Sequence, residues 1–134
     1  MNTRLRTEAD NDRLTEVIGF VDEYLEANGC SLKLQMQIDL CVEEIFVNIA
    51  SYAYEGSEGY AEIELGIESG ELTIVFTDSG VPYDPLKKPD PDTTLSADER
   101  DIGGLGIFLV KKTMDEVLYN YEDGKNVLTL KKKL

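Results

Sequence analysis

The sequence contains no histidine, and this absence excludes several classes of enzyme. Ser-His-Asp and Cys-His catalysis, histidine-ligated metal sites and phosphohistidine intermediates all need the imidazole side chain. Cysteine is nearly as scarce: Cys30 and Cys41 stand eleven positions apart, without the CxxC spacing of a zinc or redox site. We therefore predict two free thiols, with Cys41 in the core.

The chain also lacks any apolar run near the roughly 18 residues that a membrane-spanning helix needs, and no apolar signal region follows Met1. We expect a cytoplasmic protein that does not bind membranes. Basic side chains are few, because 13 Lys and Arg stand against 27 Asp and Glu, a formal net charge of −14. This field repels phosphate backbones, so we expect no direct binding of nucleic acid. It suits a basic protein partner, although a solvated acidic surface is the commoner explanation.

The patterns that are present predict one α+β domain over residues 1–134. Apolar residues at helical spacing predict helices between Asp10 and Gly29, from Ser31 to about Tyr54, and over residues 103–116. Alternating segments around the turn signals Ser-Gly and Asp-Gly predict two hairpins. This order predicts a mostly antiparallel sheet with three helices on one face, a two-layer sandwich. The predicted strands cover residues 3–9, 60–69, 71–78, 116–122 and 125–133.

The second helix carries a carboxylate and a carboxamide one turn apart in the segment EEIFVNIASYAY. Projected at about 100° per residue, its broad apolar face holds Leu34, Ile38, Val42, Ile45, Ile49, Tyr52 and Ala53. Its predicted solvated face holds Gln35, Asp39 and Glu43, and a narrow polar stripe holds Gln37, Glu44, Asn48 and Ser51. The stripe fits a general base, Glu44, beside an amide ligand of Mg²⁺, Asn48. A second wet edge or an interface explains the same stripe.

Two further motifs are consistent with a nucleotide site. Asp78 ends an apolar strand and is followed by a turn with Gly80, where an acid can accept a hydrogen bond from an exocyclic amine. An ordinary Asp-Ser-Gly turn gives the same letters. The glycines of DIGGLGIFLVKK open the third helix, where backbone N–H groups can bind phosphates. A hinge for the preceding proline-rich loop is the competing explanation.

In this order and spacing the three motifs resemble those of the GHKL ATPase superfamily, which has the Bergerat ATP-binding fold. Within it, nearly the whole chain is similar to the RsbW-like anti-sigma factor kinases. EEIFVNIASYAY resembles the family's N box, DSGVPYDP its first glycine box, and GGLGIFLVKKTMDEVLY its second glycine box. The resemblance implies ATP and Mg²⁺ as cofactors, Glu44 as general base and Asn48 as Mg²⁺ ligand. It further implies that Asp78 binds the adenine amino group, that Gly80 packs near the ring, and that the phosphates meet Gly103, Gly104, Leu105 and Gly106.

The sequence departs from the family pattern at two positions. Tyr52 stands where many relatives have histidine, and Pro82 replaces a second glycine of the wider superfamily. Residues 84–103 would form the ATP lid, and the sequence leaves open which lid cation contacts phosphate: Lys87, Lys88 or Arg100.

The resemblance implies a serine/threonine protein kinase that phosphorylates a small antagonist protein at a Ser or Thr. Sequestration of a sigma factor and formation of a homodimer are open alternatives for its further partners. A nucleotide-gated protein-binding regulator without kinase activity is the alternative function. Retention of Glu44 favours the kinase, because binding alone needs no base, although the same carboxylate could hold a water molecule near Mg²⁺.

Overall fold

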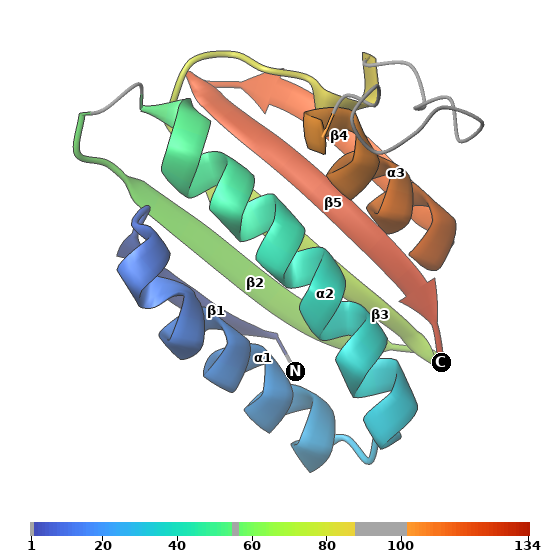
Figure 1. Cartoon of the computed structure of the whole chain (residues 1–134). Helices are drawn as coiled ribbons and strands as arrows, with labels where there is room; N and C mark the ends of the chain where they lie inside the picture. Colours follow the sequence, from blue (N-terminus) through green and yellow to red (C-terminus); the bar gives the residue numbers. More distant parts are fainter. Residues whose placement is uncertain (1, 55–56, 88–101) are drawn as a thin grey trace.

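The computed structural model describes residues 2–54, 57–87 and 102–134, and for residues 102–105 it describes the backbone alone. Five strands and three α-helices follow one another in the predicted order (Figure 1). The strands are β1 (Thr3–Glu8), β2 (Tyr60–Glu68), β3 (Glu71–Asp78), β4 (Glu116–Glu122) and β5 (Lys125–Lys133). The helices are α1 (Leu14–Ala27), α2 (Leu32–Asn48) and α3 (Ile102–Thr113), with the short turns η1 (Asn11–Arg13), η2 (Ile49–Ala53) and η3 (Pro85–Lys87).

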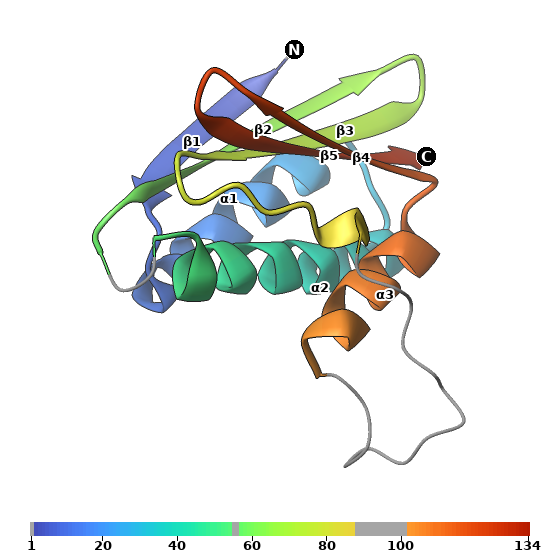
Figure 2. The same cartoon turned by 90° about the horizontal axis from the view of Figure 1, so that it is seen from above.

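The strands form one antiparallel sheet in the order β1-β2-β3-β5-β4. All three helices lie against one face of it, which Figure 2 shows edge-on. The predicted α+β two-layer sandwich is therefore confirmed. No helix in the described part of the chain is long and apolar enough to span a membrane.

Local sequence sets both hairpin turns and the start of α2. Ser69 and Gly70 between β2 and β3, and Asp123 and Gly124 between β4 and β5, have φ values of 52°, 77°, 53° and 75°. Two successive residues with positive φ match the twist of the flanking strands, as the turn signals predicted. Ser31 caps α2, since its Oγ accepts a hydrogen bond from the backbone N–H of Leu34 at 3.1 Å.

The core lies between the helices and the inner face of the sheet. Alternate residues of β2 and β3 point into it, and the three helices cover them with apolar side chains, of which Phe46 is fully buried. Cys41 is buried here, and both cysteines are free, as predicted. Burial raises the pKa of the Cys41 thiol, which keeps it protonated and unreactive at neutral pH.

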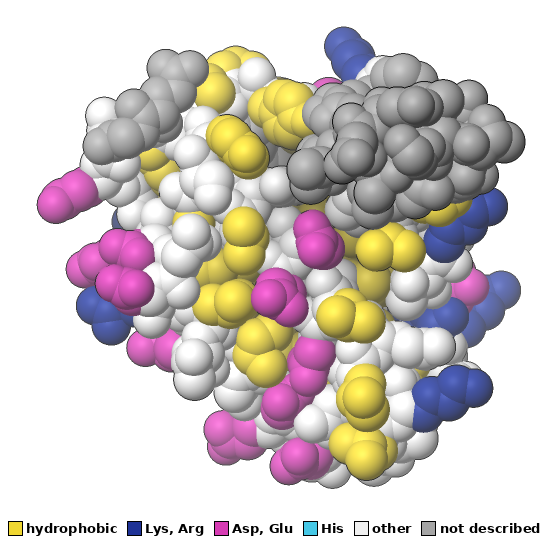
Figure 3. Space-filling view, in the orientation of Figure 1, with side chains coloured by type: hydrophobic (Ala, Val, Ile, Leu, Met, Phe, Trp, Pro, Cys, Tyr) yellow, Lys and Arg dark blue, Asp and Glu magenta, His cyan; other side chains and the backbone are white. Residues whose placement is uncertain are grey.

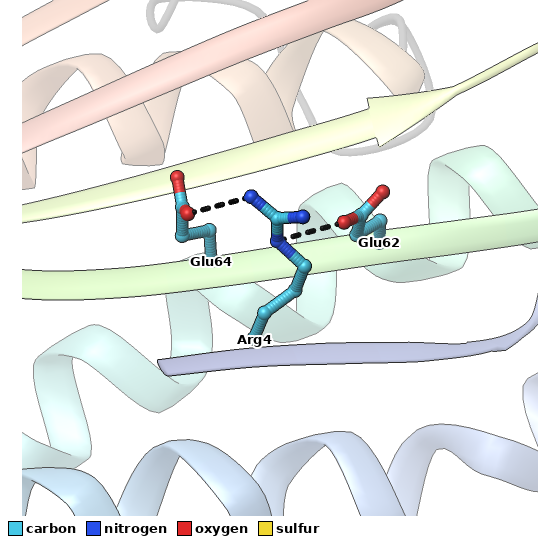
Figure 4. A network of polar contacts seen from close by, with 3 residues as sticks. All are labelled: Arg4, Glu62 and Glu64. Carbon is cyan, nitrogen blue, oxygen red and sulfur yellow. Dashed lines mark hydrogen bonds and ion pairs between the residues drawn. The ribbon is translucent and has the colours of Figure 1, made fainter. Parts of the chain in front are cut away.

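The outer face of the sheet carries charged pairs across strands. Arg4 on β1 lies between two carboxylates of β2, with Nε 2.9 Å from Glu62 and an amino nitrogen 3.0 Å from Glu64 (Figure 4). Because side chains alternate between faces along a strand, a slip of one residue would turn Arg4 into the core. These two ion pairs therefore depend on the register of β1 on β2, and being exposed they add little stability.

Helix α2 departs from the sequence projection near its end. After Asn48 the chain makes a π-helical turn, η2, which takes more residues per turn than an α-helix and rotates the later side chains about the helix axis. Tyr52, predicted on the apolar core face, is 70% exposed for this reason. The prediction for Gln35 is wrong in the opposite direction: its side chain is buried and its amide lies 3.4 Å from Glu26 of α1.

Asp39 also departs from its predicted place on the solvated face. Its side chain is half-buried against α1, where it faces Asp22, and one carboxyl oxygen of each residue is buried without a hydrogen-bond partner among the described residues. Burial raises the pKa of Asp39 to about 8, and Asp22 acts in the same direction, because it can accept a hydrogen bond from the protonated form of Asp39 and its negative charge repels the ionised form. The sequence projection missed this because it did not place α1 beside α2.

This raised pKa predicts a pH-dependent stability. Asp39 has a pKa of 3.8 when unperturbed and about 8 when folded, so between these values the folded state binds more protons than the unfolded state. The free energy of unfolding should fall as pH rises through this window and level off above it. Asp39→Asn should remove a slope worth about 1–2 kcal/mol, which is well below the full linkage value because solvent screens a half-buried carboxyl. Urea unfolding at several pH values measures it, with the exposed neighbour Glu43→Gln as control; parallel curves for Asp39→Asn and wild type would contradict the pairing.

Candidate functional site

A pocket of about 610 Å³ lies where α2 and η2 meet the ends of β3 and β5. Its volume is in the range that holds a nucleotide-sized ligand. Polar groups are few, and most of the wall is apolar or aromatic. The lining residues are Ile45, Asn48, Ile49, Ser51, Tyr52, Ala53, Phe76, Asp78, Val81, Pro82, Tyr83, Pro85, Tyr119, Asn126 and Leu128.

Asp78, the last residue of β3, supplies the buried carboxylate of this pocket. Its side chain is 5% exposed, and Oδ1 accepts hydrogen bonds from the backbone N–H of Gly80 at 2.9 Å and from the amide of Asn126 at 3.0 Å. Oδ2 has no hydrogen-bond partner among the described residues. A carboxylate oriented by two donors on one oxygen offers the other to a ligand that carries a hydrogen-bond donor.

Asn126 on β5 is a buried polar residue of the site that the sequence reasoning missed. It pairs with Asp78 in the β3–β5 register, and besides its bond to Asp78 its Nδ2 donates to the carbonyl of Val81 at 2.9 Å. Its Oδ1 accepts from the backbone N–H of Tyr83 at 3.1 Å and from the Tyr119 hydroxyl. All four hydrogen-bonding positions of the amide are filled. A signal was present in the sequence: along β5, Asn126 alternates in phase with Leu128 and Leu130 and so falls on the inward face of the strand.

Gly80 is needed because two backbone segments meet there. A Cβ atom on Gly80 would lie 2.2 Å from the carbonyl oxygen of Ala53, and that same oxygen accepts a hydrogen bond from the N–H of Val81 at 2.8 Å. The glycine thus lets the turn after Asp78 pack directly on the end of η2. Its predicted place beside a bound ring stays a prediction.

Tyr54 links the turn after Asp78 to β2 through hydrogen bonds of its hydroxyl. Its hydroxyl donates to the carbonyl of Tyr60 at 2.6 Å and accepts from the N–H of Ser79 at 2.9 Å. Burial raises the pKa of Tyr54, so the hydroxyl keeps its proton and both bonds at neutral pH. The Tyr60 hydroxyl forms a further hydrogen bond with the Ser79 Oγ at 2.9 Å, so both the backbone and the side chain of Ser79 are hydrogen-bonded to a tyrosine.

The polar stripe of α2 reaches the pocket at one end. Asn48 lines the pocket, and the rotation introduced by η2 brings Ser51 and Tyr52 to the same wall. With Tyr83 and Tyr119, Tyr52 gives the pocket an aromatic rim that the sequence reasoning did not anticipate. Asn48 and Asp78, which lie thirty residues apart in the sequence, therefore line the same pocket.

Glu44, one turn before Asn48, lies against the first part of α3. A Cβ atom on Gly106 would stand 2.3 Å from Oε2 of Glu44, so a larger residue at this position would require the Glu44 carboxylate to shift. Glu44 is half-buried and does not line the pocket itself. The structure thus brings the predicted base and the last glycine of GGLG into contact.

The remaining predicted positions are described in part. Gly103, Gly104 and Leu105 lie in the first turn of α3, as the glycine-opened helix predicted, with only their backbone described. Of the predicted lid, residues 88–101 lie outside the described residues, and with them Lys88 and Arg100. Lys87 ends η3 and is exposed.

Comparison with known proteins decides the family. A family model of the histidine kinase-like ATPase domain matches residues 7–132. The chain belongs to this ATPase family. The match covers every strand and helix described above except the first residues of β1 and the last of β5, and it confirms the resemblance deduced from the three motifs.

This ATPase domain is also similar to curated protein kinases. It is 28% identical over 117 residues to the serine/threonine-protein kinase BtrW of Bordetella bronchiseptica. The aligned residues cover 87% of this chain and 82% of BtrW. It is 29% identical over 108 residues to the serine-protein kinase RsbW of Listeria monocytogenes, covering 77% and 69%. Against RsbW of Bacillus thuringiensis the identity is 28% over 96 residues, covering 69% and 60%.

The contact at Gly80 gives a stability test of the site's framework. Gly80→Ala should lower the free energy of unfolding by about 1–3 kcal/mol, because the new methyl group meets a backbone oxygen that cannot swing aside. Gly19→Ala is the matched control: nothing lies within 4 Å of its Cβ position, and alanine in the exposed face of α1 should raise stability by about 0.5–1 kcal/mol. Urea unfolding measures both. Equal effects of the two substitutions would show that the turn does not pack as described.

Proposed function

We propose that this member of the histidine kinase-like ATPase family is a protein kinase that transfers the γ-phosphoryl group of ATP to a Ser or Thr of a small antagonist protein. The observation that carries the proposal is the convergence of Asp78 and Asn48 on one pocket, with Glu44 one helical turn away against α3. The names of BtrW and RsbW, which are serine or serine/threonine kinases, support the same reaction.

The pocket suits the adenine end of ATP. Membership of an ATPase-domain family supports ATP as the nucleotide. The Oδ2 of Asp78, which has no partner among the described residues, is an acceptor that matches the exocyclic amine of adenine and opposes the carbonyl that guanine or hypoxanthine carries at the same position. The aromatic rim suits a flat ring, and the glycines that open α3 suit the phosphates.

The residues present also fit Mg²⁺. No group of three or more acidic or cysteine side chains among the described residues could hold a metal ion by itself. Mg²⁺ prefers one or two protein oxygens together with phosphate oxygens, and Asn48 offers an amide oxygen at the pocket wall. When bound, Mg²⁺ would neutralise phosphate charge and orient the nucleotide.

Glu44 is the base of the proposed reaction. Its carboxylate accepts the proton of the substrate hydroxyl as the hydroxyl oxygen forms its bond to the γ-phosphorus. The bond between that phosphorus and the bridging oxygen breaks, and ADP leaves with the electron pair. Positioning and charge neutralisation carry most of such a transfer, so the turn that fixes Asp78 matters as much as the base.

The adenine role of Asp78 is tested with two diphosphates. Wild-type protein should bind ADP at least about tenfold tighter than inosine diphosphate, which has an oxygen in place of the amine, since an unpaired buried polar group costs about 1–3 kcal/mol. Asp78→Asn should lower the affinity for ADP, so that ADP and inosine diphosphate bind with similar affinity. Calorimetry measures both ligands, with the exposed Asp12→Asn as control. Unchanged discrimination in Asp78→Asn would remove Asp78 from base recognition.

The base is tested by separating binding from transfer. Glu44→Gln keeps the size of the side chain and removes the charge that accepts a proton, so ATP affinity should stay near the wild-type value. Single-turnover transfer to a serine-bearing antagonist should fall about 10²- to 10⁴-fold. Glu43→Gln, one residue earlier and exposed, is the matched control and should transfer at the wild-type rate.

Asn48→Ala separates the metal ligand from the base, because it should weaken Mg²⁺-dependent ATP binding and transfer together. Wild-type transfer by Glu44→Gln would show that Glu44 is not the base. A wild-type protein that binds the antagonist only with ATP present and transfers nothing would instead support the nucleotide-gated regulator.

A further inference from the structure

Helix α2 exposes three large apolar side chains to solvent. Leu32, Met36 and Leu40 are 69%, 60% and 65% exposed. They follow one another at intervals of four residues and so form one ridge along the helix, which we name the α2 ridge. Single exposed apolar residues are common, but three in a row on one ridge mark a surface that another molecule covers.

The α2 ridge leads directly to the candidate site. Continued by one step of four residues it reaches Glu44, and by a second step Asn48. Leu40 stands one turn from Glu44, about 6 Å along the helix axis, and Met36 about 12 Å. A protein that packs on the ridge therefore brings its own surface to the carboxylate of Glu44. No other exposed apolar side chains of the described residues share a helix with a proposed catalytic group.

The charges around the ridge select the kind of molecule that covers it. Outside the half-buried pair of Asp22 and Asp39, helix α1 carries three acidic side chains and α2 two, against the single basic side chain of Lys33. Figure 3 shows hydrophobic and acidic side chains interleaved over the face that α2 crosses, with Lys and Arg confined to its margin. A two-fold dimer would place this face against itself and bring acid against acid, which is unfavourable.

We propose that the α2 ridge is the docking surface for the protein substrate, which packs on it with an apolar surface bordered by Lys or Arg and thereby delivers its Ser or Thr to Glu44. The inference rests on the proposed kinase function and adds to it the surface that recognises the substrate. Exposed leucine and methionine side chains supply the apolar contact, and the carboxylates of α1 and α2 supply attraction and orientation.

The test begins by identifying the substrate. Wild-type protein and Glu44→Gln are incubated with radiolabelled ATP, Mg²⁺ and the proteins of the source organism, and a protein labelled on Ser or Thr by the wild type alone is purified as the probe. Steady-state phosphorylation of this probe then compares Met36→Asp and Leu40→Asp with the wild type. The matched control is Leu118→Asp, which changes an exposed leucine on β4, away from the helices.

We expect Met36→Asp and Leu40→Asp to raise KM for the probe about tenfold or more, with kcat at saturating probe and ATP affinity near wild type. Met36→Leu should restore the wild-type KM, and Leu118→Asp should leave it unchanged. An unchanged KM in both ridge variants overturns the docking surface while leaving the kinase function intact. If the wild type labels no protein, the proposed function fails and this inference with it. A wild-type dimer that Met36→Asp converts to a monomer would assign the ridge to a second copy and overturn the proposal.

Discussion

The buried amide of Asn126 is the constraint on which the candidate site depends. It binds Asp78 of the neighbouring strand, the carbonyl of Val81 and the N–H of Tyr83, so one side chain fixes both the carboxylate and the turn after it. Because all four positions of the amide are filled, none is left to satisfy the second oxygen of Asp78. Within the described part of the chain, the pocket thus keeps one carboxylate oxygen without a partner, while the donors on the other oxygen offset the cost of burying the charge.

Helix α2 joins the core to this site. Its inner face packs on the sheet, its end turns through η2 to line the pocket, and its outer face presents the apolar ridge. The π-helical turn allows the end of the helix to line the pocket, since it rotates Tyr52 away from the core and toward the pocket without ending the helix. Gly106 completes the arrangement by allowing α3 to approach Glu44. One helix therefore carries the proposed metal ligand, the proposed base and the surface proposed to bring a substrate to them.

Local sequence predicted most of the fold. Alternation along the strands, the two hairpin turns and the start of α2 at Ser31 all depend on neighbouring residues, and all were predicted correctly. The errors concern contacts between elements: Gln35 is buried and Asp39 half-buried because α1 packs beside α2, which a projection of one helix cannot show. Sequence reasoning missed Asn126 for the same reason, because only the β3–β5 register places it beside Asp78.

The most direct test of the account is the location of the metal–nucleotide complex in solution. Mn²⁺ substituted for Mg²⁺ broadens NMR signals of nearby nuclei, so isotope-labelled protein can be titrated with ADP and Mn²⁺. The account predicts early loss of the side-chain amide signals of Asn48 and of the backbone amides at the start of α3, while those of the hairpin turn at Ser69 and Gly70 stay sharp. Sharp Asn48 signals at saturating Mn²⁺ and ADP, or broadening centred on that hairpin, would contradict it.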